Sequence, residues 1–76
     1  MRQFDRITLD PEVMGGRPCI RGMRVTVGAI LGLLASKKTN REILEAYPYL
    51  EEGDIDAALS YAAWRMQEGE ADLKSA

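Results

Sequence analysis

The chain has 76 residues, a net charge of −2, 46% hydrophobic residues, one cysteine and no histidine. A chain of this length forms one small domain that buries only about 60% of its unfolded surface, and such domains commonly gain stability from a disulfide, a metal or self-association. The single Cys19 excludes an internal disulfide and the lack of histidine argues against zinc, so self-association is the expected reinforcement.

Neither a signal peptide nor a membrane span is expected. The first residues are polar, and the longest mostly apolar stretch, residues 25–35, is too short to cross a bilayer, which predicts a cytoplasmic protein. The charge is divided unevenly, because residues 1–41 hold eight basic and three acidic side chains whereas residues 42–76 hold two and nine. This division indicates either two surfaces with different partners or an uneven distribution of solvated charge.

A small β-ribbon with turns is expected over residues 6–26. Residues 6–9 alternate polar and apolar side chains and therefore predict a short strand. Residues 18–20 and 23–25 are two further extended pieces joined by a turn. A ribbon this small is not stable alone, so it must lie against helices or a partner chain.

Residues 15–26 form a cationic turn region with three glycines, three arginines and a proline. Glycine adopts backbone angles that other residues avoid and proline fixes its own, so this stretch has a defined shape that is not helical. Arg24 lies beside an apolar residue just before the first helix, and we expect its guanidinium to bind turn carbonyls or a carboxylate. Arg17 and Arg21 are expected to be the exposed cations of this turn region.

The first of three helices predicted over residues 27–68 begins after Thr26, a suitable N-cap, and continues to about residue 37. Its apolar residues follow the spacing of one buried face. Gly28 and Gly32 lie four residues apart on one side of this helix. They would let a second backbone come close, so we expect the ribbon and this helix to build a homodimer or a higher homo-oligomer.

The second helix is predicted over residues 40–46. Thr39 and Glu42 match a capping box at its start, and Pro48 disfavours a helical residue before it and so ends the helix. The third helix is expected from residue 51 or 52 to about residue 68. Helical spacing over three turns is kept by Ile55, Ala58, Leu59, Ala62, Ala63 and Met66. Tyr61 and Trp64 lie off this stripe, where they can face a neighbouring molecule.

The predicted fold class is therefore mainly α in a single domain. A small N-terminal β-ribbon precedes a three-helix body over residues 27–68, and residues 69–76 form a flexible tail. The last two helices are joined by a tight turn, which is the outline of a helix-turn-helix. That outline alone is weak evidence for DNA binding, because most small three-helix domains share it.

The charges on this predicted helix-turn-helix are unusual for a DNA-binding protein. The front of the second helix of the pair usually enters the major groove. Here that front carries four acids, Glu51, Glu52, Asp54 and Asp56, which suit the helix dipole but would repel phosphates. We therefore assign DNA binding to the basic half of the chain. The alternative for each of these cations, taken singly, is an ordinary solvated surface charge. The candidate DNA-binding residues are Arg17, Arg21, Lys37, Lys38 and Arg41.

Neither catalysis nor nucleotide binding is expected. No histidine is available as a general base, and Cys19 between two apolar neighbours suits a small packing residue better than a nucleophile. The turn at Gly15 and Gly16 lacks both recognised spacings of phosphate-binding glycine loops. We therefore predict no catalytic residue, no cofactor and no metal site.

The order of these pieces resembles the prokaryotic domain-of-unknown-function family 433. In the N-terminal half the matching segments are Ile7-Thr8-Leu9-Asp10-Pro11, Gly15-Gly16-Arg17-Pro18, Ile20-Arg21-Gly22 and Arg24-Val25. In the helical half they are Ile30, Leu34, Glu42-Ile43-Leu44, Tyr47-Pro48-Tyr49-Leu50, Asp54-Ile55, Ala57-Ala58-Leu59 and Tyr61-Ala62. The chain departs from the family at Met23, where a small hydroxyl residue is usual, and at Glu51, where serine or threonine is frequent.

The resemblance implies a homeodomain-like or winged-helix-like fold and an antitoxin of a toxin–antitoxin pair, whose partner is a PIN-like ribonuclease. By analogy with other antitoxins, the protein would hold that nuclease inactive and bind its own operator DNA as a dimer. Carboxylates suit the positive RNA-binding cleft of such a partner, so the partner-binding residues are placed on the acidic helix and tail, at Tyr61, Trp64, Met66 and Leu73. The alternative is a dimeric protein-interaction module that does not bind DNA.

Overall fold

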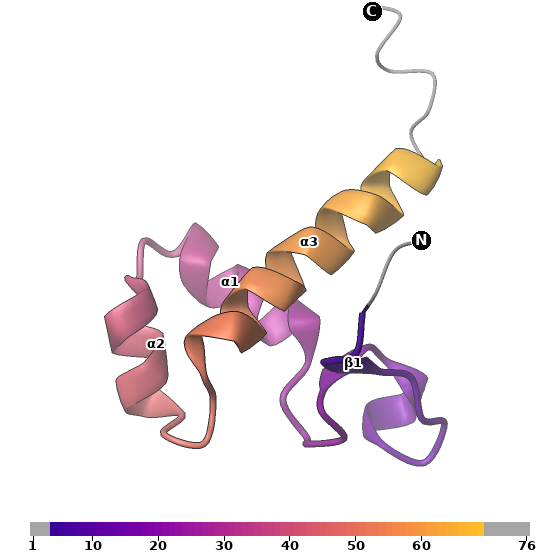
Figure 1. The fold of residues 1–76 in the computed structure, drawn as a ribbon, viewed down its shortest axis with the longest axis horizontal. Coiled ribbons are helices and arrows are strands. Elements are labelled where there is room, and N and C mark those ends of the chain that lie inside the picture. Colours follow the sequence, from indigo (N-terminus) through magenta and orange to yellow (C-terminus); the bar gives the residue numbers. More distant parts are fainter. Residues whose placement is uncertain (1–3, 70–76) are drawn as a thin grey trace, which may run out of the picture.

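The computed structural model describes residues 4–69 and has the predicted mainly helical architecture (Figure 1). Its elements are strand β1 (Ile7–Thr8), the 3₁₀ turn η1 (Met14–Gly16), strand β2 (Cys19–Ile20), and helices α1 (Val27–Ala35), α2 (Asn40–Ala46) and α3 (Glu52–Gly69). The C-terminal half of α3 extends past α1 and α2, while the ribbon lies at the opposite end of the molecule from α2 (Figure 1).

The ribbon is a two-stranded antiparallel sheet followed by a tight turn. Ile7 pairs with Ile20, and Thr8 pairs with Cys19. The chain then reverses at once, because the Met23 N–H donates to the Ile20 carbonyl over 2.8 Å. Both central residues of this turn have positive φ angles, 45° at Arg21 and 74° at Gly22, which defines a type I′ turn.

The predicted caps of α1 and α2 are confirmed. The Thr26 hydroxyl accepts a hydrogen bond from the Ala29 N–H over 3.0 Å. Thr39 and Glu42 form the complete capping box, with the Glu42 N–H donating to the Thr39 hydroxyl and the Thr39 N–H donating to the Glu42 carboxylate. These bonds are local, which is why the sequence identifies them.

Helix α1 ends at Ala35, two residues before the predicted end, because Lys37 turns into the left-handed region at a φ of 74°. The Lys37 N–H donates to the Leu34 carbonyl and the Lys38 N–H donates to the Leu33 carbonyl. This pair of bonds is a Schellman motif with a lysine at the position that glycine usually occupies. The motif places both lysines in the exposed connection between α1 and α2.

The core takes one fully buried isoleucine from each of four elements. Ile20 of β2, Ile30 of α1, Ile43 of α2 and Ile55 of α3 are at most 1% exposed. Side chains buried this completely each contribute about 1.5–3 kcal/mol of transfer free energy. The ribbon is therefore part of the same core as the helices, as its small size requires.

Candidate functional site

The carboxylate of Asp54 is 0% exposed at the start of α3 and accepts four hydrogen bonds. Its Oδ1 accepts from Arg6 Nη1 at 2.9 Å and from Arg21 Nε at 3.1 Å. Its Oδ2 accepts from Arg21 Nη2 at 2.9 Å and from the Glu51 backbone N–H at 2.8 Å. A buried carboxylate is tolerated only when it is paired and bonded in this way, so Asp54 belongs to the interior of the protein.

Two opposing effects set the pKa of Asp54. Burial penalises the charged form and raises the pKa, whereas hydrogen bonds from Arg21, the Glu51 backbone and Arg6 lower it. The bonds prevail and hold the pKa at about 2, below the usual 3.8. The acid is therefore ionised near neutral pH and forms a permanent anchor for two arginines from the ribbon.

Arg6 fastens the ribbon to the first turn of α3. Its Nη1 atom also donates to Glu51 Oε1 over 2.8 Å, so one guanidinium bridges two acids. A Cβ atom at Gly53 would lie only 2.9 Å from Arg6 Cζ. Glycine is unfavourable inside a helix, and here it leaves room for the guanidinium to lie across the helix backbone.

Arg21 connects the hairpin turn to the turn between α2 and α3. Besides its two bonds to Asp54, its Nη2 atom donates to the backbone carbonyl of Tyr49 over 3.0 Å. Its φ angle of 45° lies where asparagine, aspartate and glycine are favoured, so an arginine is strained at this position. These three bonds offset the strain at Arg21. They also hold its guanidinium against the protein, whereas the sequence predicts that Arg21 contacts DNA.

The remaining predicted DNA-binding residues are exposed but do not form one surface. Lys37, Lys38 and Arg41 lie together at the connection from α1 to α2, and we call them the basic corner. Arg41 also makes a 3.5 Å ion pair with Glu45. Arg17 directly follows η1, which lies at the other end of the molecule from the basic corner (Figure 1).

The prediction that Arg24 binds turn carbonyls or a carboxylate is wrong. Its neighbour Val25 is buried in the core, so the alternation of an extended chain points Arg24 outward. Within residues 4–69 the exposed Arg24 side chain makes no hydrogen bond or ion pair. Arg6 and Arg21 have the structural role instead.

Two of the predicted partner-binding residues pack against the N-terminal segment. Tyr61 is 8% exposed, and its ring meets that of Phe4 edge to face with centroids 5.3 Å apart. Trp64 is half-buried, with its ring 5.4 Å from Phe4 and 5.8 Å from Tyr61. Met66 is 59% exposed, and Leu73 lies outside the described residues.

A row of apolar residues lies exposed along the outer face of α3. Leu59 is 46% exposed, Met66 is 59% exposed, and Ala63 lies exposed between them. Their spacing of i, i+4 and i+7 places them on one line, which we call the apolar stripe. The apolar band of α3 is wider than the face that the core uses, so one edge of it stays open.

Three further features of the described residues concern Cys19, metal binding and membrane crossing. The buried thiol of Cys19 donates to the Arg17 carbonyl over 3.3 Å. Within residues 4–69, no three histidine, cysteine or acidic side chains are grouped so as to hold a metal ion. In the same part of the chain, no helix combines the length and the apolar character that crossing a bilayer requires.

Comparison with known proteins identifies relatives without an assigned activity. The model of the family described as "Protein of unknown function (DUF433)" matches residues 7–62. "Uncharacterized protein y4eO" of Sinorhizobium fredii is 36% identical over 56 residues, which are 74% of this chain and 25% of that protein. The crystal structure of a DUF433 member protein from Anabaena variabilis superposes with a TM-score of 0.69 at 28% identity, over 90% of this chain and 62% of that one. The chain thus spans a quarter of the curated relative and less than two thirds of the structural one.

Proposed function

This chain belongs to the DUF433 family, and we propose that it acts in the cytoplasm as the antitoxin-like component of a toxin–antitoxin pair. In this role it binds a PIN-like ribonuclease, holds it inactive, and binds operator DNA as a homodimer. The observation that carries the proposal is the apolar stripe of α3, because an exposed row of apolar side chains at helical spacing suits a hydrophobic groove on a partner.

The charge around the stripe favours a basic partner. Glu52 and Asp56 are exposed on the same line of α3 as Leu59, two turns and one turn before it, respectively. Neither acid forms an ion pair within residues 4–69. A ribonuclease must present positive charge to its RNA, so a cleft of this kind is complementary to the acidic end of the stripe.

The basic corner supports the DNA-binding half of the proposal. In a helix-turn-helix the first helix of the pair crosses the phosphate backbone, and the basic corner lies at the start of α2, which is that helix. Lys37, Lys38 and Arg41 all have exposed side chains there. Because Arg21 is held by Asp54, we assign the phosphate contacts to the basic corner.

Helix α1 supports the homodimer. Its nine residues carry no charge, and Gly28, Ala29 and Gly32 are exposed on its outer side. No heavy atom would lie within 4 Å of a Cβ atom built at Gly32, so the backbone is open to a close approach there. A second α1 is the neutral partner that such a face would accept.

The proposal gives the chain no catalytic step of its own. The thiol of Cys19 is buried and bonded to a carbonyl, and Asp54 is held ionised by two arginines. Neither group is arranged as a nucleophile or as a general base.

A protein-interaction module without DNA binding is the second candidate function. The exposed acids Glu52 and Asp56 favour it, because they lie at the front of α3, where a recognition helix would meet phosphates. In this alternative the apolar stripe and α1 keep their partners, and the basic corner is ordinary solvated charge.

The proposal is tested by co-expressing the full chain with the ribonuclease encoded by the adjacent gene. We expect the two proteins to elute as one complex in size-exclusion chromatography, and we expect the complex to cleave RNA more slowly than the free nuclease. Separate elution together with undiminished RNA cleavage would contradict the proposal.

A further inference from the structure

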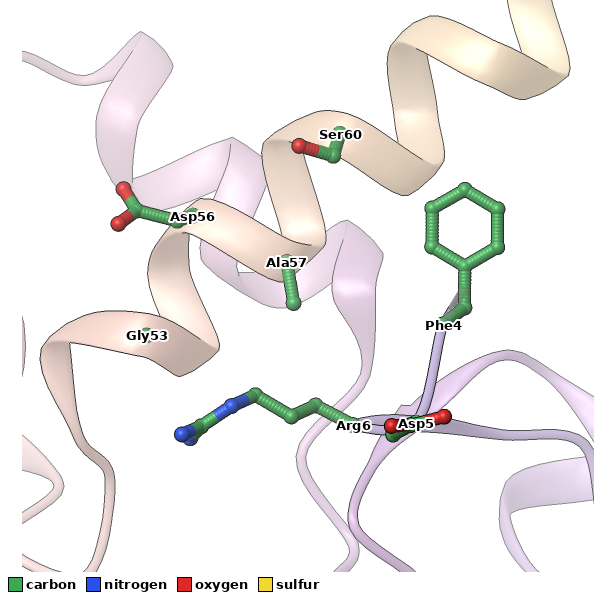
Figure 2. A pocket seen from close by; sticks show the side chains of 7 residues that line it. All are labelled: Phe4, Asp5, Arg6, Gly53, Asp56, Ala57 and Ser60. Atoms are coloured by element: carbon green, nitrogen blue, oxygen red, sulfur yellow. The ribbon is translucent and has the colours of Figure 1, made fainter. Parts of the chain in front are cut away.

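An open groove of about 270 Å³ runs between residues 4–6 and the first half of α3 (Figure 2). The ribbon side contributes Phe4, Asp5 and Arg6, and α3 contributes Gly53, Asp56, Ala57 and Ser60. Pockets for small molecules usually measure about 300–1,000 Å³ and are mostly apolar. This groove is smaller and more polar, so its size suits one side chain of a partner protein.

The groove carries unpaired negative charge. Among the residues that the structure describes, the cation of the groove is Arg6, and two carboxylates already match its charge, Glu51 at 2.8 Å and Asp54 at 2.9 Å. Asp5 on the ribbon side and Asp56 on the helix side form no ion pair within residues 4–69. Figure 2 shows these two acids at opposite ends of the groove, with the Asp56 carboxylate directed away from the ribbon side. A cation of an occupant would therefore meet a carboxylate at either end of the groove.

The apolar parts of the groove suit the stem of a long basic side chain. The Phe4 ring stands beside α3, Ala57 points into the gap between helix and ribbon, and Arg6 reaches away from Phe4 toward Gly53 (Figure 2). The Phe4 ring is itself held by Tyr61 and Trp64, at centroid distances of 5.3 and 5.4 Å. Lysine and arginine bury their methylene stems on such surfaces while the charged end meets carboxylates.

We infer that this groove accepts a lysine or arginine side chain of the protein that covers the apolar stripe. The inference rests on the proposed function and names the chemistry of the contact. Asp56 belongs to the groove and also lies three residues before Leu59, so the groove is continuous with the stripe. One partner surface with an apolar patch beside a basic side chain fills both.

A peptide titration of the full chain tests the groove without the ribonuclease. The probes are acetyl-Gly-Arg-Gly-amide and acetyl-Gly-Lys-Gly-amide, with acetyl-Gly-Glu-Gly-amide as the matched peptide of opposite charge. Amide resonances of the ¹⁵N-labelled protein are followed during each titration. We expect saturable shifts at Asp5, Ala57 and Ser60 with a basic peptide, and none with the acidic peptide.

Two isosteric variants and one matched control locate the contact. Asp56→Asn and Asp5→Asn each remove one carboxylate charge, and we expect each to weaken peptide binding by roughly two- to fivefold, as for a solvent-exposed ion pair. Glu12→Gln makes the same charge change at an exposed acid outside the groove and should leave binding unchanged. Three results would each overturn the inference. They are shifts that are equal for all three peptides, no shifts at all, and shifts that neither asparagine variant changes.

The outcome is separable from that of the proposed function. If the ribonuclease complex forms but the groove does not bind the basic peptides, the inference fails and the proposed function stands. If the groove binds the peptides but no complex forms with the ribonuclease, the proposed function fails and the groove serves another basic partner.

Discussion

Arg21 and Asp54 form a two-point ion pair that joins the hairpin turn of the ribbon to the first turn of α3. Arg21 Nε lies 3.1 Å from Asp54 Oδ1, and Arg21 Nη2 lies 2.9 Å from Asp54 Oδ2. A planar guanidinium meets a carboxylate bidentately in a way that lysine does not reproduce. The pair therefore fixes where the ribbon lies, and with it the groove beside α3.

The strain at Arg21 predicts an unusual order of stability among its variants. Arg21→Gly and Arg21→Ala both lose the pair with Asp54, so both should unfold at lower urea concentration than the wild type. Glycine tolerates the φ angle of 45° and alanine does not, so the glycine variant should be the more stable of the two by about 1 kcal/mol. Urea unfolding monitored by circular dichroism measures this difference, and an alanine variant at least as stable as the glycine variant would contradict the strain.

The low pKa of Asp54 predicts a loss of stability in acid. A carboxyl whose folded pKa lies below its unfolded pKa contributes stability above the unfolded value and loses it as pH falls through the folded value. For Asp54 these values are about 2 and 3.8, so about 2 kcal/mol of unfolding free energy should disappear between them. Urea unfolding at a series of pH values measures the slope. Asp54→Asn should remove this part of the pH dependence, and an unchanged slope in that variant would assign it to other carboxyls.

Gly53 should resist a substitution that normally stabilises helices. Glycine to alanine inside a helix adds about 1 kcal/mol, and Gly32→Ala should show that gain in the monomer because its Cβ would meet open space. At Gly53 the new Cβ would lie 2.9 Å from Arg6 Cζ and would displace the guanidinium from Asp54. Thermal unfolding of both variants at low protein concentration provides the comparison. An equal gain at the two sites would show that Arg6 moves aside without cost.

The basic corner should determine how DNA binding depends on salt. Each phosphate contact adds about 0.9 to the slope of log affinity against log salt, so Lys38→Gln with Arg41→Gln should lower the slope by about 2. Arg24→Gln is the matched control, because Arg24 is exposed and unpaired within the described part of the chain. Fluorescence anisotropy with upstream promoter DNA at several salt concentrations measures the slopes. If the wild type does not bind DNA at low salt, the DNA-binding half of the proposal is wrong. The protein-interaction module without DNA binding then remains.

The sequence predicts the features of this protein that depend on near neighbours. The cap at Thr26 and the capping box of Thr39 and Glu42 are bonds across three residues, and the starts of α1 and α2 follow from them. The early end of α1 is the local exception, because a lysine stands at Lys37 where glycine usually marks a Schellman motif.

The contacts between distant segments were not predicted. Arg6 and Asp54 are 48 residues apart, and the local bond from the Glu51 backbone N–H to Asp54 does not indicate that two distant arginines meet the same carboxylate. The one available signal was the turn at Arg21 and Gly22, where an arginine occupies a position that favours glycine or asparagine. The exposure of Leu59 was missed for a similar reason, since helical spacing does not say how wide a face the rest of the chain will cover.

The affinity of the full chain for its proposed ribonuclease partner shows whether the apolar stripe is the partner-binding surface. Leu59→Glu places a charge in the apolar stripe, whereas Leu9→Glu makes the same change at an exposed leucine of the ribbon, with the two side chains 46% and 61% exposed. Isothermal titration calorimetry should show binding weakened about tenfold or more by Leu59→Glu, as for a central interface residue, and unchanged by Leu9→Glu. Equal affinities for the wild type and Leu59→Glu would contradict the assignment of the apolar stripe as the partner-binding surface.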